Sequence, residues 1–225
     1  MAEADSSRLI CWLSPAFPVG SYAYSHGLEW AVEAGDVADE TSLAAWLETL
    51  LLEGAGRNDA ILLAAAYRAA AAGDTAALEE ANDLALALAA SAELWLETAQ
   101  QGRSFLDVIL AAWPAPGLSE MTRTLGRVAY PVALGLAAAL HGVPLAAVLR
   151  GQLTAMAGNL VSAAIRLAPI GQTAGQRLLA GLVPRLDDLA GDVLRLDLDD
   201  VSASTFRADL GSFRHETQYT RLFRS

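Results

Sequence analysis

Residues 128–149 read VAYPVALGLAAALHGVPLAAVL and contain no Asp, Glu, Lys or Arg. A stretch of this length is long enough to cross a bilayer as a helix. However, Pro131, the pair His141-Gly142 and Pro144 interrupt it, and alanine supplies much of its apolar character. Proline is well tolerated in the first turn of a helix, and glycine often follows the last turn. We therefore predict a buried helical hairpin, with a turn at His141-Gly142, in preference to a membrane span.

Helical spacing of apolar residues continues on both sides of this stretch. Leu43, Trp46, Leu47 and Leu50 recur at helical intervals behind the capping residue Asp39. The same reasoning predicts further helices over residues 58–73, 75–95 with continuation towards 109, 119–126, 131–141, 144–168, 173–184 and 184–196, with Pro184 cutting or kinking the last pair. The sequence has no alternating run of β-branched residues and no Ser/Gly-rich linker. We predict an all-α bundle of roughly nine or ten helices, forming one domain over residues 1–225.

Composition excludes some partners and compartments. The chain has 15 basic and 26 acidic residues, a net charge of −11, which argues against a nucleic-acid partner. It has a single cysteine, Cys11, so it can form no internal disulfide. Acidic residues rather than basic ones precede the first apolar run, which argues against a signal peptide. We expect a cytoplasmic protein with no membrane association.

The last twenty residues differ from the rest of the chain. Residues 206–225 hold four arginines against two acidic residues, a net charge of +2, which leaves −13 on residues 1–205. Arginine and aromatic side chains frequently anchor interfaces. We interpret 206–225 as a C-terminal docking tail. Two destinations stay open at this stage: a partner protein, or the body of the chain itself, with Tyr219, Leu222 and Phe223 packing back and stabilising it.

Three segments resemble one known family, in the family's order. They are residues 13–29 (LSPAFPVGSYAYSHGLE), residues 160–172 (LVSAAIRLAPIGQ) and residues 214–225 (RHETQYTRLFRS). Each is similar to the F-type urease accessory proteins, the UreF family. The resemblance implies a non-enzymatic adaptor that forms a homodimer and binds the D-type (H-type) urease accessory protein. That complex would recruit the G-type nickel-binding GTPase to apo-urease, promote nickel insertion and influence GTP hydrolysis.

The first of these segments begins with a loop. Pro15 and Pro18 prevent a continuous helix, and Ser21 is placed to cap a helix from Tyr22 to about Ala34. Gly27 in the middle of such a helix would indicate that another backbone approaches closely. This helix is either docked into the core or facing a partner or a second copy. The resemblance favours a partner contact for its exposed polar residues and a core position for Leu28 and Trp30.

The resemblance and the residue types together nominate a set of partner-binding residues. They come from the first segment, from the polar break between residues 169 and 177, and from the tail: Tyr24, Ser25, Glu29, Gln172, Arg177, Arg214, His215, Glu216, Tyr219, Arg221 and Phe223. If one arginine acts on a partner GTPase, the candidates are Arg177, Arg214 and Arg221. His215 either contacts a partner or forms hydrogen bonds within the docked tail, and we favour the second.

The chain lacks the motifs of the common catalytic and metal sites. Its three histidines, His26, His141 and His215, are far apart, and no HxH or CxxC spacing is present. Ser25 precedes His26, but no nucleophile elbow surrounds it, and no phosphate-binding P-loop exists. We predict no catalytic residues, no metal site and no cofactor. The alternatives are a helical-bundle enzyme acting on a small apolar substrate, and a generic helical scaffold.

Overall fold

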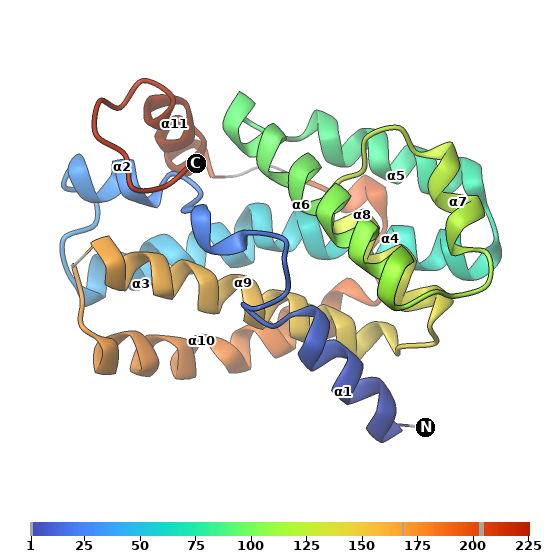
Figure 1. Cartoon of the computed structure of the whole chain (residues 1–225). Helices are drawn as coiled ribbons and strands as arrows, with labels where there is room; N and C mark the ends of the chain where they lie inside the picture. The colour runs from blue at the N-terminus through green and yellow to red at the C-terminus, as the bar shows by residue number, and fades with distance from the viewer. Residues whose placement is uncertain (1, 168, 203–204) are drawn as a thin grey trace.

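The computed structural model describes residues 2–167, 169–202 and 205–225, and every regular element in those ranges is helical (Figure 1). The prediction of an all-α bundle is confirmed. The α-helices are α1 (Ala2–Trp12), α2 (Leu28–Glu33), α3 (Glu40–Glu48), α4 (Ala55–Ala72), α5 (Thr75–Ala87), α6 (Ala92–Ala112), α7 (Leu118–Thr124), α8 (Tyr130–Leu140), α9 (Leu145–Leu167), α10 (Gln172–Val193) and α11 (Phe206–His215). Two 3₁₀ turns, η1 (Ser21–Ala23) and η3 (Leu198–Asp200), and a π-helical turn, η2 (Thr49–Glu53), complete the elements.

The charge-free stretch of residues 128–149 supplies helix α8, which lies at the centre of the bundle. Helix α8 has Pro131 in its first turn and is buried over Pro131–Ala138. It packs against α4 on one side and α6 on the other. The turn at Gly142, which has a φ of 71°, leads into α9. The predicted pair of helices is therefore confirmed, and its apolar character is explained by burial within the protein. No helix in the described part of the chain combines the length and the apolar character needed to cross a bilayer.

The helices α9, α10 and α3 form the other half of the bundle, and α4 contacts both halves. Helix α10 continues through Pro184, so the prediction that Pro184 cuts or kinks the helix was wrong as far as a cut is concerned. Leu178, Leu182, Leu186 and Leu189 are all buried at four- or three-residue intervals on both sides of this proline. Their burial stabilises both halves of the helix enough to offset the missing hydrogen bond, which costs about 3 kcal/mol.

Three predicted boundaries were wrong. Residues 75–109 do not form one long helix, because the chain breaks after α5 and Ser91 caps α6, accepting a hydrogen bond from the backbone N–H of Leu94 at 3.1 Å. Helix α4 begins at Ala55 instead of Asn58. The segment after Ser21 forms only a 3₁₀ turn, and helix α2 begins seven residues later at Leu28.

Two helices were not predicted at all. Helix α1 at the N-terminus contacts α9, and helix α11 in the tail packs against α2. The face of α11 that meets the body carries Ala208, Gly211, Ser212 and His215, all of them buried. These are small or polar side chains, so this segment lacks the apolar residues at helical spacing by which most helices are recognised in a sequence.

Candidate functional site

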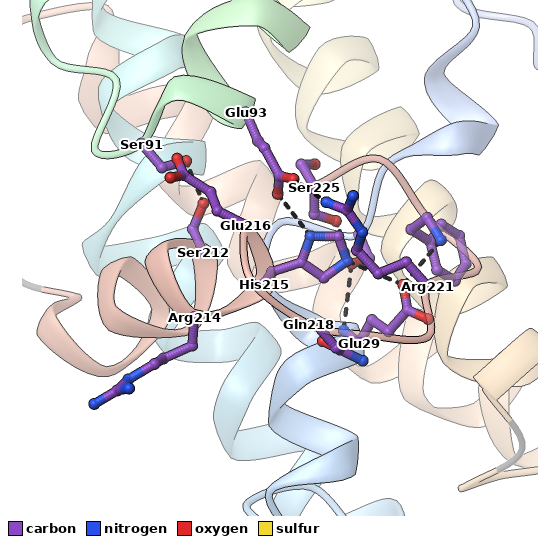
Figure 2. Close-up of polar contacts among 12 residues, drawn as sticks. Glu29, Ser91, Glu93, Ser212, Arg214, His215, Glu216, Gln218, Arg221 and Ser225 are labelled. Atoms are coloured by element: carbon purple, nitrogen blue, oxygen red, sulfur yellow. Dashed lines mark hydrogen bonds and ion pairs between the residues drawn. The ribbon is translucent and has the colours of Figure 1, made fainter.

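The tail folds back onto α2 and the N-terminal end of α6, where several carboxylates hold it (Figure 2). We call this arrangement the tail socket and define it by Ser25, Glu29, Glu93 and Glu97, with the tail residues bound to them. The four socket residues come from the loop before α2, from α2 itself and from α6. The tail residues lie about 120 to 200 positions further along the chain. No local sequence pattern connects these parts.

A tight turn places the first part of the socket. His26 has a φ of 52° and Gly27 a φ of 75°, so two consecutive residues adopt the left-handed conformation that ends one segment and starts α2. A Cβ atom on Gly27 would lie 2.8 Å from the backbone nitrogen of Ser212. The predicted close approach of another backbone at Gly27 is confirmed, although Gly27 precedes the helix and does not lie within it. This contact brings α11 directly against α2.

Glu29 binds the backbone of the tail. Its Oε1 accepts a hydrogen bond from the N–H of Leu222 at 2.6 Å, and its Oε2 accepts one from the N–H of Phe223 at 2.8 Å. The same Oε2 lies 3.1 Å from Nε2 of His215. A buried carboxylate is costly unless hydrogen bonds and opposite charge compensate it. Here two backbone amides and one imidazole do so, all supplied by the tail.

His215 connects Glu29 with Glu93. Its Nδ1 lies 2.6 Å from Oε2 of Glu93, and the ring is fully buried. Both ring nitrogens therefore face carboxylate oxygens. The guanidinium of Arg221 adds a positive charge, with its Nη1 2.6 Å from Oε1 of Glu93. The expectation that His215 forms hydrogen bonds within a docked tail agrees with this geometry.

The end of the tail binds Glu97 and Ser25. Ser225 donates its hydroxyl to Oε2 of Glu97 at 2.7 Å, and its backbone oxygen accepts hydrogen bonds from both the N–H and the hydroxyl of Ser25. The other oxygen of Glu97 lies 3.0 Å from Nε2 of His26. Burial alone lowers the pKa of His26, but the Glu97 carboxylate outweighs it, so the pKa of His26 is raised. The last residues of the tail thus share a charged network with α6.

One face of the tail is buried and the other is open to solvent. Phe223 is buried, with the guanidinium of Arg166 stacked 4.3 Å from its ring centre. Tyr219 is fully exposed, Leu222 is 61% exposed and Phe213 is 52% exposed. Large apolar side chains left in solvent beside a rigidly held backbone are typical of a protein-binding surface. We call Phe213, Tyr219 and Leu222 the exposed tail face.

Of the eleven residues nominated from the sequence, five belong to the tail socket. Ser25, Glu29, His215, Arg221 and Phe223 are part of it, and all of them except Arg221 are buried within the chain. A direct contact between these residues and a partner stays a prediction. Glu216 accepts a hydrogen bond from the backbone of Ala92 at 2.8 Å. Tyr24 is also buried and donates its hydroxyl to Gln100 at 3.0 Å.

The remaining nominated residues are exposed. Arg214 points away from the socket in Figure 2, and Tyr219 belongs to the exposed tail face. Gln172 and Arg177 lie on α10, which packs with α3 and α9 and not with the tail (Figure 1). Arg177 pairs there with Glu40 of α3 at 3.0 Å. The structure therefore separates these two residues from the tail.

Sequence reasoning missed the acidic half of the socket. Glu93 and Glu97 occupy the first turns of α6, and the sequence interpretation placed this helix inside a longer one. It also missed a cavity of about 230 Å³ beside the socket, lined by Asp59, Glu97, Tyr130 and Gln152 among others. Burial raises the pKa of Asp59 to about 7. In the described part of the chain, no three His, Cys, Asp or Glu side chains are arranged to hold a metal ion.

Comparison with known proteins points to one family. The family model described as UreF matches residues 37–183. The urease accessory protein UreF of Xanthobacter autotrophicus is 66% identical, in an alignment that covers all of this chain and 94% of that protein. The UreF proteins of Azorhizobium caulinodans and of a Methylobacterium species are 64% and 61% identical, with 100% and 96% of this chain covered and 97% and 87% of those proteins. The resemblance seen in the sequence is confirmed, and the chain belongs to the UreF family.

Proposed function

We propose that this chain is a non-enzymatic urease accessory protein, an adaptor that presents the exposed tail face to a partner of the urease maturation system. The observation that carries the proposal is the split character of the tail. Its backbone and one face are fixed by the tail socket, while Tyr219 and Leu222 stay in solvent. A backbone that is already fixed before binding lowers the entropy cost of forming the complex with a partner.

The partners follow from the family. We infer that the chain binds the D-type (H-type) urease accessory protein, forms a homodimer and recruits the G-type nickel GTPase to apo-urease, promoting nickel insertion in the cytoplasm. Of the three arginines nominated for contact with the GTPase, Arg177 pairs with Glu40 and Arg221 with Glu93. Within the described residues no carboxylate lies within ion-pair distance of Arg214, so Arg214 is the best placed of the three to act on a partner.

A complementation experiment tests the adaptor function. Urease is produced in cells that lack the gene for this chain and are supplied with nickel, and urease activity and bound nickel are measured with and without the chain. We expect activity and nickel content to depend on the chain, while the amount of urease protein stays the same. Equal activity without the chain would refute the proposal. Turnover of a small substrate by the isolated chain would favour the alternative of a helical-bundle enzyme.

Homodimer formation is a separate part of the proposal and has its own measurement. Light scattering on the isolated chain at micromolar concentration should give twice the monomer mass of 23.6 kDa. A monomer that still supports urease activation would refute the dimer and leave the adaptor function intact.

A further inference from the structure

An open groove of about 620 Å³ lies beside the tail socket and carries an unusual charge for this protein. It runs between the loop of residues 18–24, the first half of α6, and residues 126–128. Arg103, Arg127 and Arg224 line it, and among the described lining residues none is Asp or Glu. Arg103 also forms a solvent-exposed ion pair with Asp107, 2.9 Å away and one turn along α6, so Arg127 and Arg224 account for most of the positive charge of the groove. The whole chain has a net charge of −11. A basic groove on an acidic protein is a local feature that the overall composition does not explain. We call it the arginine groove.

Aromatic and apolar side chains accompany the arginines. The guanidinium of Arg127 lies 4.9 Å from the centre of the Trp95 ring, which holds it in place by a cation–π contact. Tyr22 and Leu96, both exposed by about half or more, lie along the same groove. Arginine beside aromatic residues is the combination enriched in the centres of protein interfaces.

The groove is also built on rigid parts of the fold. A Cβ atom on Gly102 of α6 would lie 2.1 Å from the backbone oxygen of Val128, so α6 and the segment 126–128 are in direct backbone contact. The side chain of Asn82 accepts a hydrogen bond from the N–H of Ala129 and donates one to the backbone oxygen of Arg127. The N–H of Arg224 donates to the backbone oxygen of Ala23 at 2.8 Å. Two of the three arginines are therefore held on fixed backbone.

From this geometry we propose that the arginine groove binds an acidic segment of a partner protein, with an apolar side chain of that segment packed against Tyr22 and Leu96. The inference rests on the adaptor function proposed above and names the chemistry of one of its contacts. Carboxylates match the guanidinium groups in charge and in fork geometry. A nucleic acid fits less well, because its extended backbone charge would also meet the negative potential of the surrounding surface.

The test compares charge variants of the groove with a control outside it. Arg103→Glu/Arg127→Glu reverses two charges, and Arg103→Gln/Arg127→Gln removes them. Arg123→Glu is the control, because Arg123 is exposed on α7 and does not line the groove. Binding of the full chain to the D-type accessory protein, to the G-type GTPase and to apo-urease is measured separately at 50 and 500 mM NaCl. Circular dichroism and thermal melting confirm that each variant is folded.

We expect the reversed variant to bind at least one of these partners tenfold or more weakly, the neutral variant to lose less, and Arg123→Glu to bind normally. High salt should weaken partner binding by the wild-type chain more than partner binding by the neutral variant. Unchanged affinity of the reversed variant for all three partners would refute the proposal that the arginine groove binds an acidic segment, and it would leave the adaptor function intact. A wild-type chain that binds none of them would refute both proposals. Binding of single-stranded RNA that is lost in the reversed variant, with partner binding intact, would also overturn the acidic-segment proposal.

Discussion

Oε2 of Glu29 lies 3.1 Å from Nε2 of His215, although 186 residues separate them in the chain. The pair connects the first family-like segment, residues 13–29, with the last, residues 214–225, so two of the three family-like segments form one structural unit. The tail is consequently part of the folded body, and its outer face remains available to partners.

Replacement of His215 tests the centre of the tail socket. His215→Ala would leave the buried carboxylate of Glu29 and the half-buried carboxylate of Glu93 without the imidazole that lies between them. We expect a loss of about 3 kcal/mol in the free energy of unfolding. This corresponds to a fall in melting temperature of roughly 6–12 °C for a chain of this size. The exposed neighbour gives the control, since Arg214→Ala should change stability by less than about 0.5 kcal/mol. Similar melting temperatures for the two variants would contradict the structural role of His215.

The contact between α2 and α11 is tested at Gly27. Gly27→Ala and Gly35→Ala both place a side chain at a positive φ, 75° and 79°, and each should cost about 1 kcal/mol for that reason. At Gly35 no atom lies within 4 Å of the new Cβ atom, whereas at Gly27 it meets the backbone of Ser212. We expect Gly27→Ala to cost about 2 kcal/mol more and to speed amide hydrogen exchange over residues 206–225. Equal losses of stability in the two variants, with unchanged amide hydrogen exchange, would show that α11 does not contact this turn closely.

A similar comparison tests the backbone contact between α6 and Val128 beside the arginine groove. Gly102→Ala would force α6 away from Val128 and should lower stability by about 2 kcal/mol or more. Gly158→Ala, within α9 and with no atom near its Cβ position, should raise stability by about 0.5–1 kcal/mol. Urea denaturation of both variants measures the difference. A stable Gly102→Ala protein would mean that the two backbones are not in fixed contact.

The cavity beside the socket gives a pH-dependent prediction. The pKa of Asp59 is about 7 in the folded chain against an ordinary value of 3.8, because burial disfavours the carboxylate. Between these values the folded state holds a proton that the unfolded state has lost, so stability falls as pH rises and levels off above pH 7. The raised pKa of His26 acts in the same direction, because its stabilising contribution is complete below pH 6.5 and is lost as pH rises through the folded value.

Asp59→Asn isolates the first of these effects. The substitution should raise stability by about 2 kcal/mol at pH 8 and have little effect near pH 4, because only the ionised carboxyl is destabilised by burial and this half-buried position keeps some access to solvent. Asp83→Asn serves as the control, since Asp83 is exposed on α5. Melting temperatures are recorded at both pH values. An Asp59→Asn protein with the pH profile of the wild-type chain would contradict the buried carboxyl.

Most of the helices could be predicted because their signals are local. Asp39 and Asp74 cap helices, Pro131 starts one and Gly73 ends one, and the structure has each of them in that role. The errors arose where distant contacts decide. Residues 22–27 read as the start of a helix, yet they form a turn that fits against the backbone of Ser212. Pro184 reads as a break, yet the buried leucines on both sides keep α10 continuous.

The site could be predicted only in part. Tyrosine, arginine and histidine identified the tail as a contact segment, but nothing local shows that Glu29, Glu93 and Glu97 receive it, because they meet only in the folded chain. Burial likewise separates residues that look equivalent in the sequence, such as Leu222 and Phe223. The single-domain organisation stays a prediction, and calorimetry should show one cooperative unfolding transition if it holds.

The most direct test concerns the exposed tail face. Tyr219→Ser/Leu222→Ser removes two exposed side chains, and Phe223→Ala removes the buried one between the socket and Arg166. Affinity for the D-type urease accessory protein and melting temperature are measured for both variants and for the chain truncated after Gly211. We predict that the double variant melts within about 2 °C of the wild-type chain and binds at least tenfold more weakly. Phe223→Ala and the truncated chain, unlike the double variant, should melt at lower temperature than the wild-type chain, because they lose buried contacts. Wild-type affinity in the double variant, or partner binding that persists in the truncated chain, would contradict the account.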